Sequence, residues 1–192
     1  VLREPIVALL FQRGEFDAAA TRLTALPLLY YSLGLWAFSA VKIVTATFFA
    51  LQDTRTPVSM AAISIAANII LGAALMRPLA HGGLALATSL ASILNLALLV
   101  RALRLKLGSL GWKRITISAC RTLLNSVAMG LAVWATSKAM LPAEKGTLPT
   151  MLVGVGASIA VGICVFGIFS YVTKSQELTY VLAEARKGIG RK

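Results

Sequence analysis

Two long apolar runs meet at one short polar segment, and this pattern constrains the fold more than any other feature of the sequence. The run Leu23–Leu51 carries a single charge, Lys42, and the run Val58–Met76 carries none. Between them, residues 53–57 (DTRTP) supply an acid, a base and a helix-starting proline. A transmembrane helix needs about 20 apolar residues. The pattern therefore predicts two spanning helices joined by a hairpin at the membrane surface.

The composition of the whole chain agrees with this interpretation and excludes most soluble folds. Hydrophobic residues make up 58% of the 192 residues and charged residues only 14%, whereas soluble domains are about 45–50% apolar and about 25% charged. A large soluble α-helical bundle would need a polar face on each helix, and these apolar runs have almost none. The predicted fold class is therefore all-α, a polytopic transmembrane helix bundle.

Five full spans, preceded by the end of another, are predicted along the chain. Residues 1–13 are apolar but too short to cross a bilayer, so they are either the end of a span whose beginning is missing or an interfacial segment. Because the sequence starts without Met or a signal peptide, we expect it to be a piece of a longer protein. Asp17 is placed to cap the helix that follows. The spans cover residues 23–50, 57–76, 84–103, 115–138 and 149–172.

Helix breakers and polar residues mark the ends of these spans. Pro57 suits the first turn of the second span, and the segment Arg77–Gly83 is a tight turn rich in Pro and Gly. The first span is longer than a bilayer requires, and Pro27 and Gly34 are candidate positions for a kink. Residues 174–192 are polar with apolar residues at helical spacing, which indicates a cytoplasmic tail with a short helix on the membrane surface.

The basic residues are distributed unevenly between the two sides of the predicted membrane. A net charge of +12 would suggest a nucleic-acid partner in a soluble protein, but here it reflects the excess of Lys and Arg in cytoplasmic loops. The 53–55 turn, the 101–114 loop and the C-terminus are therefore predicted to be cytoplasmic, and no nucleic acid is expected to bind. That side carries Arg55, Arg101, Arg104, Lys106, Lys113, Arg114, Lys174, Arg186, Lys187, Arg191 and Lys192, and the other carries Arg13, Arg22, Arg77, Lys138 and Lys145.

No catalytic or metal-binding set is visible in the sequence. The single histidine, His81, lies in the Arg77–Gly83 turn with no Cys, Asp or Glu at metal-ligand spacing. Cys120 and Cys164 lie inside apolar runs, where we interpret them as small buried hydrophobes that form neither a disulfide nor a metal site. We therefore predict no enzyme activity, no cofactor and no metal.

Polar residues inside or beside the spans are the candidate functional residues. Lys42 lies about nine residues, or roughly 13 Å at 1.5 Å per residue, from the end of the first span. A lysine near mid-membrane costs at least ~2.5–3.5 kcal/mol to insert, so it either faces a wet functional cavity or is paired for packing alone. Arg22 either meets an anionic headgroup or substrate at the outer side or is an interfacial anchor. Hydrogen bonding between helices is the expected role of Asn68, Asn95 and Asn125.

Three segments, in this order and spacing, resemble one known family. They are Glu4–Phe16 (EPIVALLFQRGEF), Phe48–Val58 (FFALQDTRTPV) and His81–Ser89 (HGGLALATS). Together with Lys42, they are similar to the MurJ (MviN) lipid II flippases of the multidrug/oligosaccharidyl-lipid/polysaccharide exporter superfamily. The likeness in motifs runs to about residue 107, and the rest of the chain agrees in hydropathy.

The resemblance implies a bacterial inner-membrane protein of fourteen helices. Two six-helix lobes would enclose a central cationic cavity, and two extra C-terminal helices would form a hydrophobic groove for a lipid tail. On that map, residues 1–107 are the latter part of the second lobe, from the end of helix nine through helices ten to twelve, and residues 108–173 hold the two extra helices. The family's C-terminus is cytoplasmic, as the charge distribution here predicts.

The function implied by the resemblance is to move an undecaprenyl-pyrophosphate-linked peptidoglycan precursor between leaflets by alternating access. Lys42 matches a family lysine that faces the cavity, Arg22 is a second candidate there, and Asp53 and Arg55 form the cytoplasmic hairpin. Membrane lipids and cell-wall synthesis proteins are the other candidate partners. Two alternatives stay open, an exporter of another polyprenyl-linked saccharide or of drugs, and a non-transporting scaffold for cell-wall synthesis.

One position departs from part of the family. Some relatives bind sodium through polar residues of the eleventh and twelfth helices, which Asn68 and Thr88 match. Where those relatives carry a carboxylate one turn after the asparagine, this chain has Gly72. Asn68 and Thr88 are therefore interpreted as the remnant of an ion site, and no coupling ion is assigned.

Overall fold

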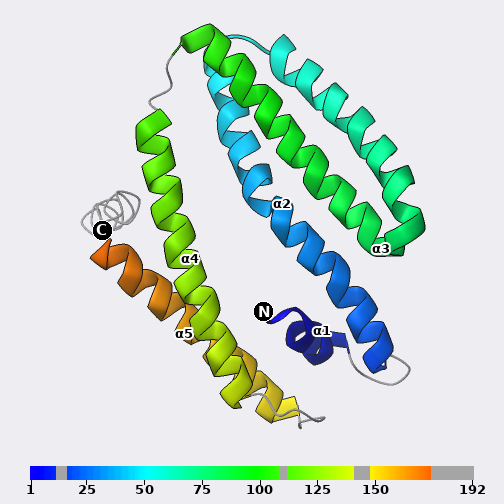
Figure 1. Cartoon of the computed structure of the whole chain (residues 1–192), viewed down its shortest axis with the longest axis vertical. Helices are drawn as coiled ribbons and strands as arrows, with labels where there is room; N and C mark the ends of the chain where they lie inside the picture. Colours follow the sequence, from blue (N-terminus) through cyan, green and yellow to red (C-terminus); the bar gives the residue numbers. More distant parts are fainter. Residues whose placement is uncertain (12–16, 109–111, 141–147, 174–192) are drawn as a thin grey trace, which may run out of the picture. The chain divides into compact units, whose positions relative to one another are not determined.

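Helices account for all regular structure in the parts of the chain that the computed structural model describes, which are residues 1–11, 17–108, 112–140 and 148–173. Within these residues, four helices, α2 to α5, are long and apolar enough to cross a membrane. The predicted all-α transmembrane class is confirmed. The helices are α1 (Arg3–Phe11), α2 (Ala18–Ala50), α3 (Arg55–Leu107), α4 (Trp112–Met140) and α5 (Leu148–Val172) (Figure 1).

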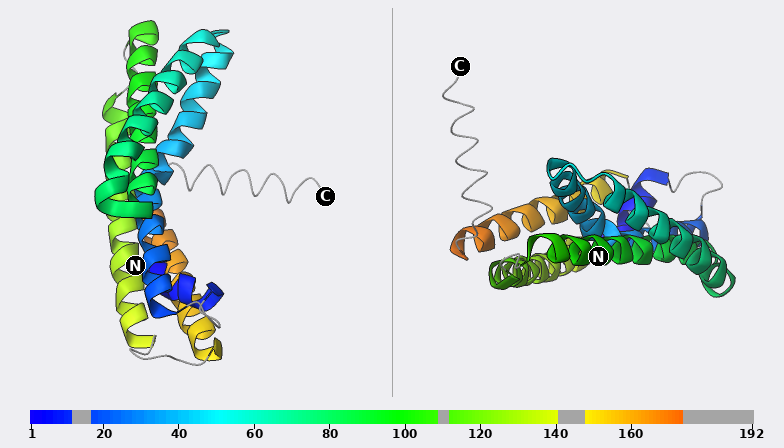
Figure 2. Two further views of the ribbon diagram at one scale, coloured as in Figure 1. Left: turned by 90° about the vertical axis from the view of Figure 1, so that its right-hand side faces the viewer. Right: turned by 90° about the horizontal axis from the view of Figure 1, so that it is seen from above.

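Helix α3 contains both the second and the third predicted spans, joined by a break at Ala80. Ala80 adopts φ 46° and ψ −129°, and Pro78 just before it has no backbone N–H to donate. The break falls inside the predicted Arg77–Gly83 turn, but helical geometry continues up to it and resumes directly after it. The result is a first arm (residues 55–79) and a second arm (residues 81–107) that run antiparallel, side by side (Figures 1 and 2). With α3 counted as one helix that is broken at Ala80, the described residues hold four candidate spans where five are predicted.

Helix α2 starts five residues before the predicted span and continues to Ala50 without a break at Pro27 or Gly34. The N–H of Ala20 donates to Asp17 Oδ1 at 2.8 Å, which confirms the predicted N-cap. Because Asp17 satisfies one of the four free N–H groups of the first turn, the helix can start there and not at residue 23.

Helix α2 packs against the second arm through small residues. Ser89 Oγ donates to the Tyr30 carbonyl oxygen at 2.6 Å, and a Cβ atom added at Gly34 would lie 2.7 Å from Ser89 Cα. Glycine and serine at this crossing let the two backbones approach closely, as is common between membrane helices. Toward residue 50 the packing becomes apolar, where Phe48 is fully buried against Leu99 and Leu103.

Helices α4 and α5 belong to a second unit of the chain. Contacts divide the chain into Phe11–Leu110 and a unit of Val1–Leu10 with Gly111–Lys192. Asn125 Nδ2 on α4 donates to Ser170 Oγ on α5 at 3.4 Å and to Thr173 Oγ1, directly after the end of α5, at 3.2 Å. These bonds confirm the predicted role of Asn125 between helices. The predicted surface helix in residues 174–192 lies outside the described residues, as do Arg13 and Lys145.

The prediction that Cys120 and Cys164 are buried is wrong. Both are free thiols on exposed faces of α4 and α5. Residues of a transmembrane helix are apolar on the lipid-facing side as well as on the packed side. Sequence alone therefore does not distinguish a cysteine that faces lipid from one that faces another helix.

Candidate functional site

Lys42 lies on an exposed face of α2 and has no ion-pair partner among the residues that the structure describes. The fully buried residues Ala37 and Phe48 mark the face of α2 that packs on α3. Lys42 is five residues beyond Ala37, so it points away from this packed face, and it is four residues beyond Phe38, so it lies one turn further along the same face as Phe38. The ammonium is therefore free to meet a ligand.

Arg22 is also exposed on α2, but the structure does not bring it to Lys42. The two residues are separated by about 30 Å of helix at 1.5 Å per residue. They therefore belong to opposite ends of α2, and a single small anionic group does not contact both.

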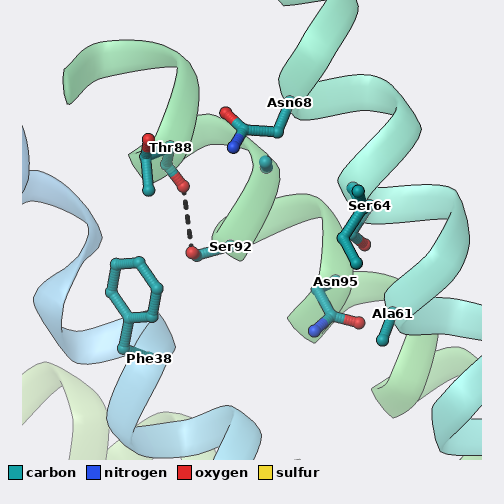
Figure 3. A pocket seen from close by; sticks show the side chains of 9 residues that line it. Phe38, Ala61, Ser64, Asn68, Thr88, Ser92 and Asn95 are labelled. Carbon is teal, nitrogen blue, oxygen red and sulfur yellow. Dashed lines mark hydrogen bonds between the residues drawn. The ribbon is translucent and has the colours of Figure 1, made fainter. Parts of the chain in front are cut away.

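A pocket lined by apolar and polar side chains lies between α2 and the two arms of α3. It has a volume of about 200 Å³ and is open on one side. Figure 3 shows side chains converging on it from both arms, with the ring of Phe38 on the α2 side. The structure thus brings together Asn68 and Thr88, which the sequence singled out as a pair, and adds three polar residues that the sequence did not connect with them. The polar lining consists of Ser64, Asn68, Thr88, Ser92 and Asn95.

The hydroxyl groups of the pocket are committed as donors to their own helices. Ser64 Oγ donates to Met60 O, Thr88 Oγ1 to Leu84 O and Ser92 Oγ to Thr88 O, each at 2.9 Å. A hydroxyl has one hydrogen and two lone pairs. Once the hydrogen is used, each of these oxygens is available to the pocket only as an acceptor.

The two asparagines of the pocket do not form the hydrogen bonds between helices that the sequence predicts. Asn68 Oδ1 and Asn95 Oδ1 are buried and have no partner among the described residues. This corrects the prediction for these two positions, whereas it holds for Asn125. The difference arises because Asn125 faces hydroxyl-bearing side chains on the opposite helix, while Asn68 and Asn95 face the pocket.

Among the described residues, the pocket offers no charged group to the sodium ion that part of the resembled family binds. Its polar lining is uncharged, and Gly72, one turn after Asn68, is buried without a side chain. Among the described residues, no three His, Cys, Asp or Glu side chains lie together to hold a metal. A cation taken out of water into a low-dielectric site is costly without a compensating charge. These neutral oxygens therefore do not hold a resident cation by themselves.

A second cluster of polar residues lies at the 51–54 turn, which joins α2 to the first arm of α3. Asp53 Oδ1 accepts from the N–H of Thr56 at 3.0 Å, and Asp53 Oδ2 accepts from the Thr56 hydroxyl at 2.6 Å. The ammonium of Lys106, at the end of the second arm, forms an ion pair with Asp53 Oδ2 and lies 5.9 Å from the ring centroid of Phe48. Asp53 therefore connects the start of the first arm with the end of the second.

These contacts change the acidity of Asp53 and leave Arg55 outside the cluster. The hydrogen bond from Lys106 and those from Thr56 hold the pKa of the Asp53 carboxyl well below its usual range. Arg55 is exposed at the start of α3. The sequence identifies Lys106 only as a basic residue of a predicted loop. Its partner, Asp53, lies 53 positions away in the chain, and no local pattern connects the two residues.

Comparison with known proteins points to one family. The family model "Lipid II flippase MurJ" matches residues 1–154. The chain is 36% identical over 135 residues to the probable lipid II flippase MurJ of Vibrio cholerae, covering 70% of this chain and 26% of that protein. It is 31% identical over 175 residues to that of Rhizobium tropici, covering 90% of this chain and 33% of that protein.

A solved structure gives the same result. The chain superimposes on lipid II flippase MurJ in an inward closed conformation with a TM-score of 0.70 and 27% identity, over 90% of this chain and 33% of that one. The chain thus spans about a quarter to a third of the length of these relatives. It is a multi-pass membrane chain whose helices follow those of its relatives.

Proposed function

The chain belongs to the MurJ family of lipid II flippases, and from this membership we propose that the complete protein moves a lipid-linked peptidoglycan precursor from the cytoplasmic to the periplasmic leaflet. The protein would act as a transporter in cell-wall biogenesis, and not as an enzyme. The family match across residues 1–154 is the observation that carries the proposal. Alternating access would supply the mechanism, with this chain as part of the moving helix bundle.

We place the protein in the bacterial inner membrane, with the Asp53–Arg55 turn and the C-terminus in the cytoplasm. The uneven distribution of basic residues supports this orientation. The ion pair of Asp53 with Lys106 puts the turn and the end of the second arm on the same side of the unit, so both count toward the same side of the membrane. Residues 1–107 would belong to the second lobe of the transporter and residues 108–173 to its two extra helices, with cell-wall synthesis proteins as candidate partners.

Lys42 is the residue that we assign to the substrate. Lys42 lies inside α2, eight residues before its end at Ala50, on an exposed face, and has no acid beside it among the described residues. Arginine and lysine form strong charge-assisted hydrogen bonds with phosphate oxygens. A pyrophosphate headgroup would thus offset the cost of placing this charge in the membrane, and Arg22 would meet the same headgroup only at the outer end of the path.

The test is Lys42→Ala in the complete protein, with transport of the lipid-linked precursor measured in reconstituted vesicles. We expect transport to fall by about tenfold or more, because a hydrogen bond to a charged group contributes roughly 1.5–3 kcal/mol. Lys42→Arg should keep much of the activity.

Ile43→Ala is the matched control, since Ile43 is 70% exposed on the same turn of α2 and carries no charge. Membrane insertion of all three variants is checked in parallel. If Lys42→Ala transports at the normal rate, the role of Lys42 is wrong. If the unaltered protein moves no precursor, the proposed function itself is wrong.

A further inference from the structure

The first arm of α3 buries few residues, whereas the second arm is buried along most of its length. Pro57, Ser64 and Gly72 are the buried residues of the first arm. The second arm has a buried residue at nearly every turn, from Gly82 near one end to Leu103 near the other. Within the unit that contains α2 and α3, the first arm is therefore the helix that packing holds least firmly.

The two arms approach each other most closely beside the break at Ala80. An added Cβ atom at Gly83 would overlap the Leu75 carbonyl oxygen, and one at Gly72 would lie 3.4 Å from Leu84 Cδ1. Ala80 itself has a positive φ of 46°, which is uncommon for a residue with a side chain. Because the backbones touch beside a position that is not helical, the break has the geometry of a pivot between the arms.

Further from the break, the contacts between the arms are weaker. The pocket of about 200 Å³ lies there. The hydroxyl group of Ser64 on the first arm donates to Met60 O, and that of Ser92 on the second arm donates to Thr88 O. Both bonds thus stay within one arm. Met60 packs, partly buried, against the apolar cluster around Phe48, and a methionine side chain adapts easily to a change in spacing.

Asp53 and Lys106 close the end of the arms that lies opposite to the break. Asp53 caps the first arm through the N–H and hydroxyl groups of Thr56, and its own backbone N–H donates to Phe48 O at 3.0 Å. Lys106 adds a charged contact from the second arm. The Asp53 side chain is 14% exposed and that of Lys106 is 45% exposed, so water weakens the pair only in part. One carboxylate therefore joins the end of α2 to the ends of both arms.

We propose that the ion pair of Asp53 with Lys106 is a clasp that sets the spacing of the two arms of α3, with the break at Ala80 as the pivot. While the clasp is closed, the first arm stays against the second and the pocket keeps its width. When the clasp opens, the first arm turns about the break as far as the short 51–54 turn allows, and the pocket widens. This device does not depend on the proposed transport function.

Helix α2 stays on the second arm when the clasp opens, because their contacts do not involve the ion pair. Ser89 Oγ donates to Tyr30 O at 2.6 Å, and Gly34 lies directly against Ser89. Phe48 is fully buried against Leu99. Close backbone packing and apolar burial hold this seam, so the proposal predicts that the first arm moves relative to a fixed pair of α2 and the second arm.

Distances between spin labels in the complete protein test this prediction. Cys120→Ser and Cys164→Ser remove two exposed thiols, and any other cysteine is replaced in the same way. The clasp labels are attached to Val58→Cys on the first arm and Leu105→Cys on the second, and the seam labels to Ile43→Cys on α2 and Leu105→Cys. All three positions are strongly exposed. Pulsed electron paramagnetic resonance gives the distance distribution of each pair of labels.

Lys106→Gln opens the clasp and leaves the cap that Asp53 forms on the first arm. We expect the population of longer distances between the clasp labels to rise severalfold, up to about fivefold, which corresponds to roughly 1 kcal/mol for a partly exposed ion pair. The seam labels should not change. Lys106→Arg should keep the original spacing, because a guanidinium group also pairs with a carboxylate. Arg101→Gln is the matched control, since it removes a positive charge from an exposed position on the same arm, and it should change neither pair of labels.

Three results would overturn the proposal. The first is an unchanged distribution of the clasp labels in Lys106→Gln, or an equal change in Arg101→Gln, because the ion pair would then not set the spacing. The second is an equal change at the seam labels, because the first arm would then not move by itself. Asp53→Asn provides the same test if Lys106→Gln fails to fold. Combining the two substitutions should add little, since each opens the same contact, and the third overturning result is a fully additive effect.

Discussion

The unit that contains α2 and α3 (the α2–α3 unit) and the pair formed by α4 and α5 (the α4–α5 pair) both consist of apolar helices that contain asparagine. The contacts of these asparagines differ between the two. On α4, Asn125 is 2% exposed and donates directly to the hydroxyl groups of Ser170 on α5 and of Thr173 just after it. On the arms of α3, the side chains of Asn68 and Asn95 line a pocket. Oδ1 is buried without a partner among the described residues in all three asparagines, so the difference lies in the bonds that Asn125 Nδ2 donates. The same residue type thus joins helices directly in one unit and lines a site in the other.

The two units also differ in how closely their helices approach. In the α2–α3 unit, an added Cβ at Gly34 would lie 2.6–2.8 Å from atoms of Ser89, backbone included. In the α4–α5 pair, an added Cβ at Gly162 would lie 2.8 Å from Val133 Cγ2, which is a side-chain atom, and one at Gly130 or Gly156 would meet nothing within 4 Å. The first unit therefore requires glycine at its helix crossing, and the second tolerates a side chain at the latter two positions.

Gly34→Ala should give the largest change in stability. The methyl group cannot avoid Ser89 Cα unless the helices separate, and overpacking of this kind costs about 1–3 kcal/mol. Separation would also break the hydrogen bond from Ser89 to the Tyr30 carbonyl. Thermal unfolding of the complete protein in detergent should therefore show a lower Tm.

Gly130→Ala on α4 is the matched control for this change. No atom lies within 4 Å of the added methyl group, and Ala is a better helix former than Gly by about 1 kcal/mol, so the Tm should stay level or rise. If both alanine variants lose equal stability, the close crossing in the α2–α3 unit does not have the role that we assign to it.

The second prediction compares the asparagines themselves. Asn125→Leu removes two side-chain hydrogen bonds and keeps the branched shape of the side chain, and such bonds between helices contribute on average about 0.6 kcal/mol and up to roughly 1.7 kcal/mol in membrane proteins. Asn68→Leu removes no bond to another described residue, so its loss should be smaller. Chemical unfolding of both variants measures the difference. A loss for Asn68→Leu as large as that for Asn125→Leu would mean that the pocket contributes as much to the fold as the direct contact does.

Sequence predicted the parts of this fold that local patterns determine. Apolar runs of sufficient length gave the spans, Asp17 gave a helix start, and a segment rich in Pro and Gly located the break at Ala80. Each follows from residues near one another in the chain, because helix length, capping and breaking are local properties.

Sequence did not predict which face of a helix meets which neighbour. The sequence predicts that Cys120 and Cys164 are buried, but both are exposed. The prediction fails because a membrane helix has no polar face that would show which side packs against other helices. Asn68 and Thr88 were paired by resemblance, but Ser64, Ser92 and Asn95 join them only through the packing of the two arms. The partner of Asp53 also comes from the far end of α3. These are contacts between distant segments, and only the tertiary structure reveals them.

The smallest change in stability is expected at the ion pair of Asp53 with Lys106. The lysine contacts of the two units also differ. Lys106 in the α2–α3 unit pairs with a carboxylate, whereas Lys138 on α4 lies 4.4 Å from the ring centroid of Trp134. The pKa of Asp53 is lowered in the fold, so its stabilising contribution is complete above the ordinary Asp pKa of about 3.9 and is lost as pH falls below that value toward the lowered pKa. Between about pH 5 and pH 8 this pair should cause no change in Tm.

Substitutions at Asp53 separate its charge from its capping role. Asp53→Asn keeps an oxygen that can accept from the N–H of Thr56 but gives up the charge for Lys106, and Asp53→Ala loses both. The Tm at neutral pH should therefore decrease from the unaltered protein to Asp53→Asn and further to Asp53→Ala, by small steps because Lys106 is partly exposed to solvent. Part of the fall in Tm below about pH 4 should disappear in both variants, whereas Lys138→Gln on α4 should leave that fall unchanged. If Asp53→Asn shows the full acid-dependent fall, another carboxyl group causes it, and the two units do not differ in the way that their lysine contacts indicate.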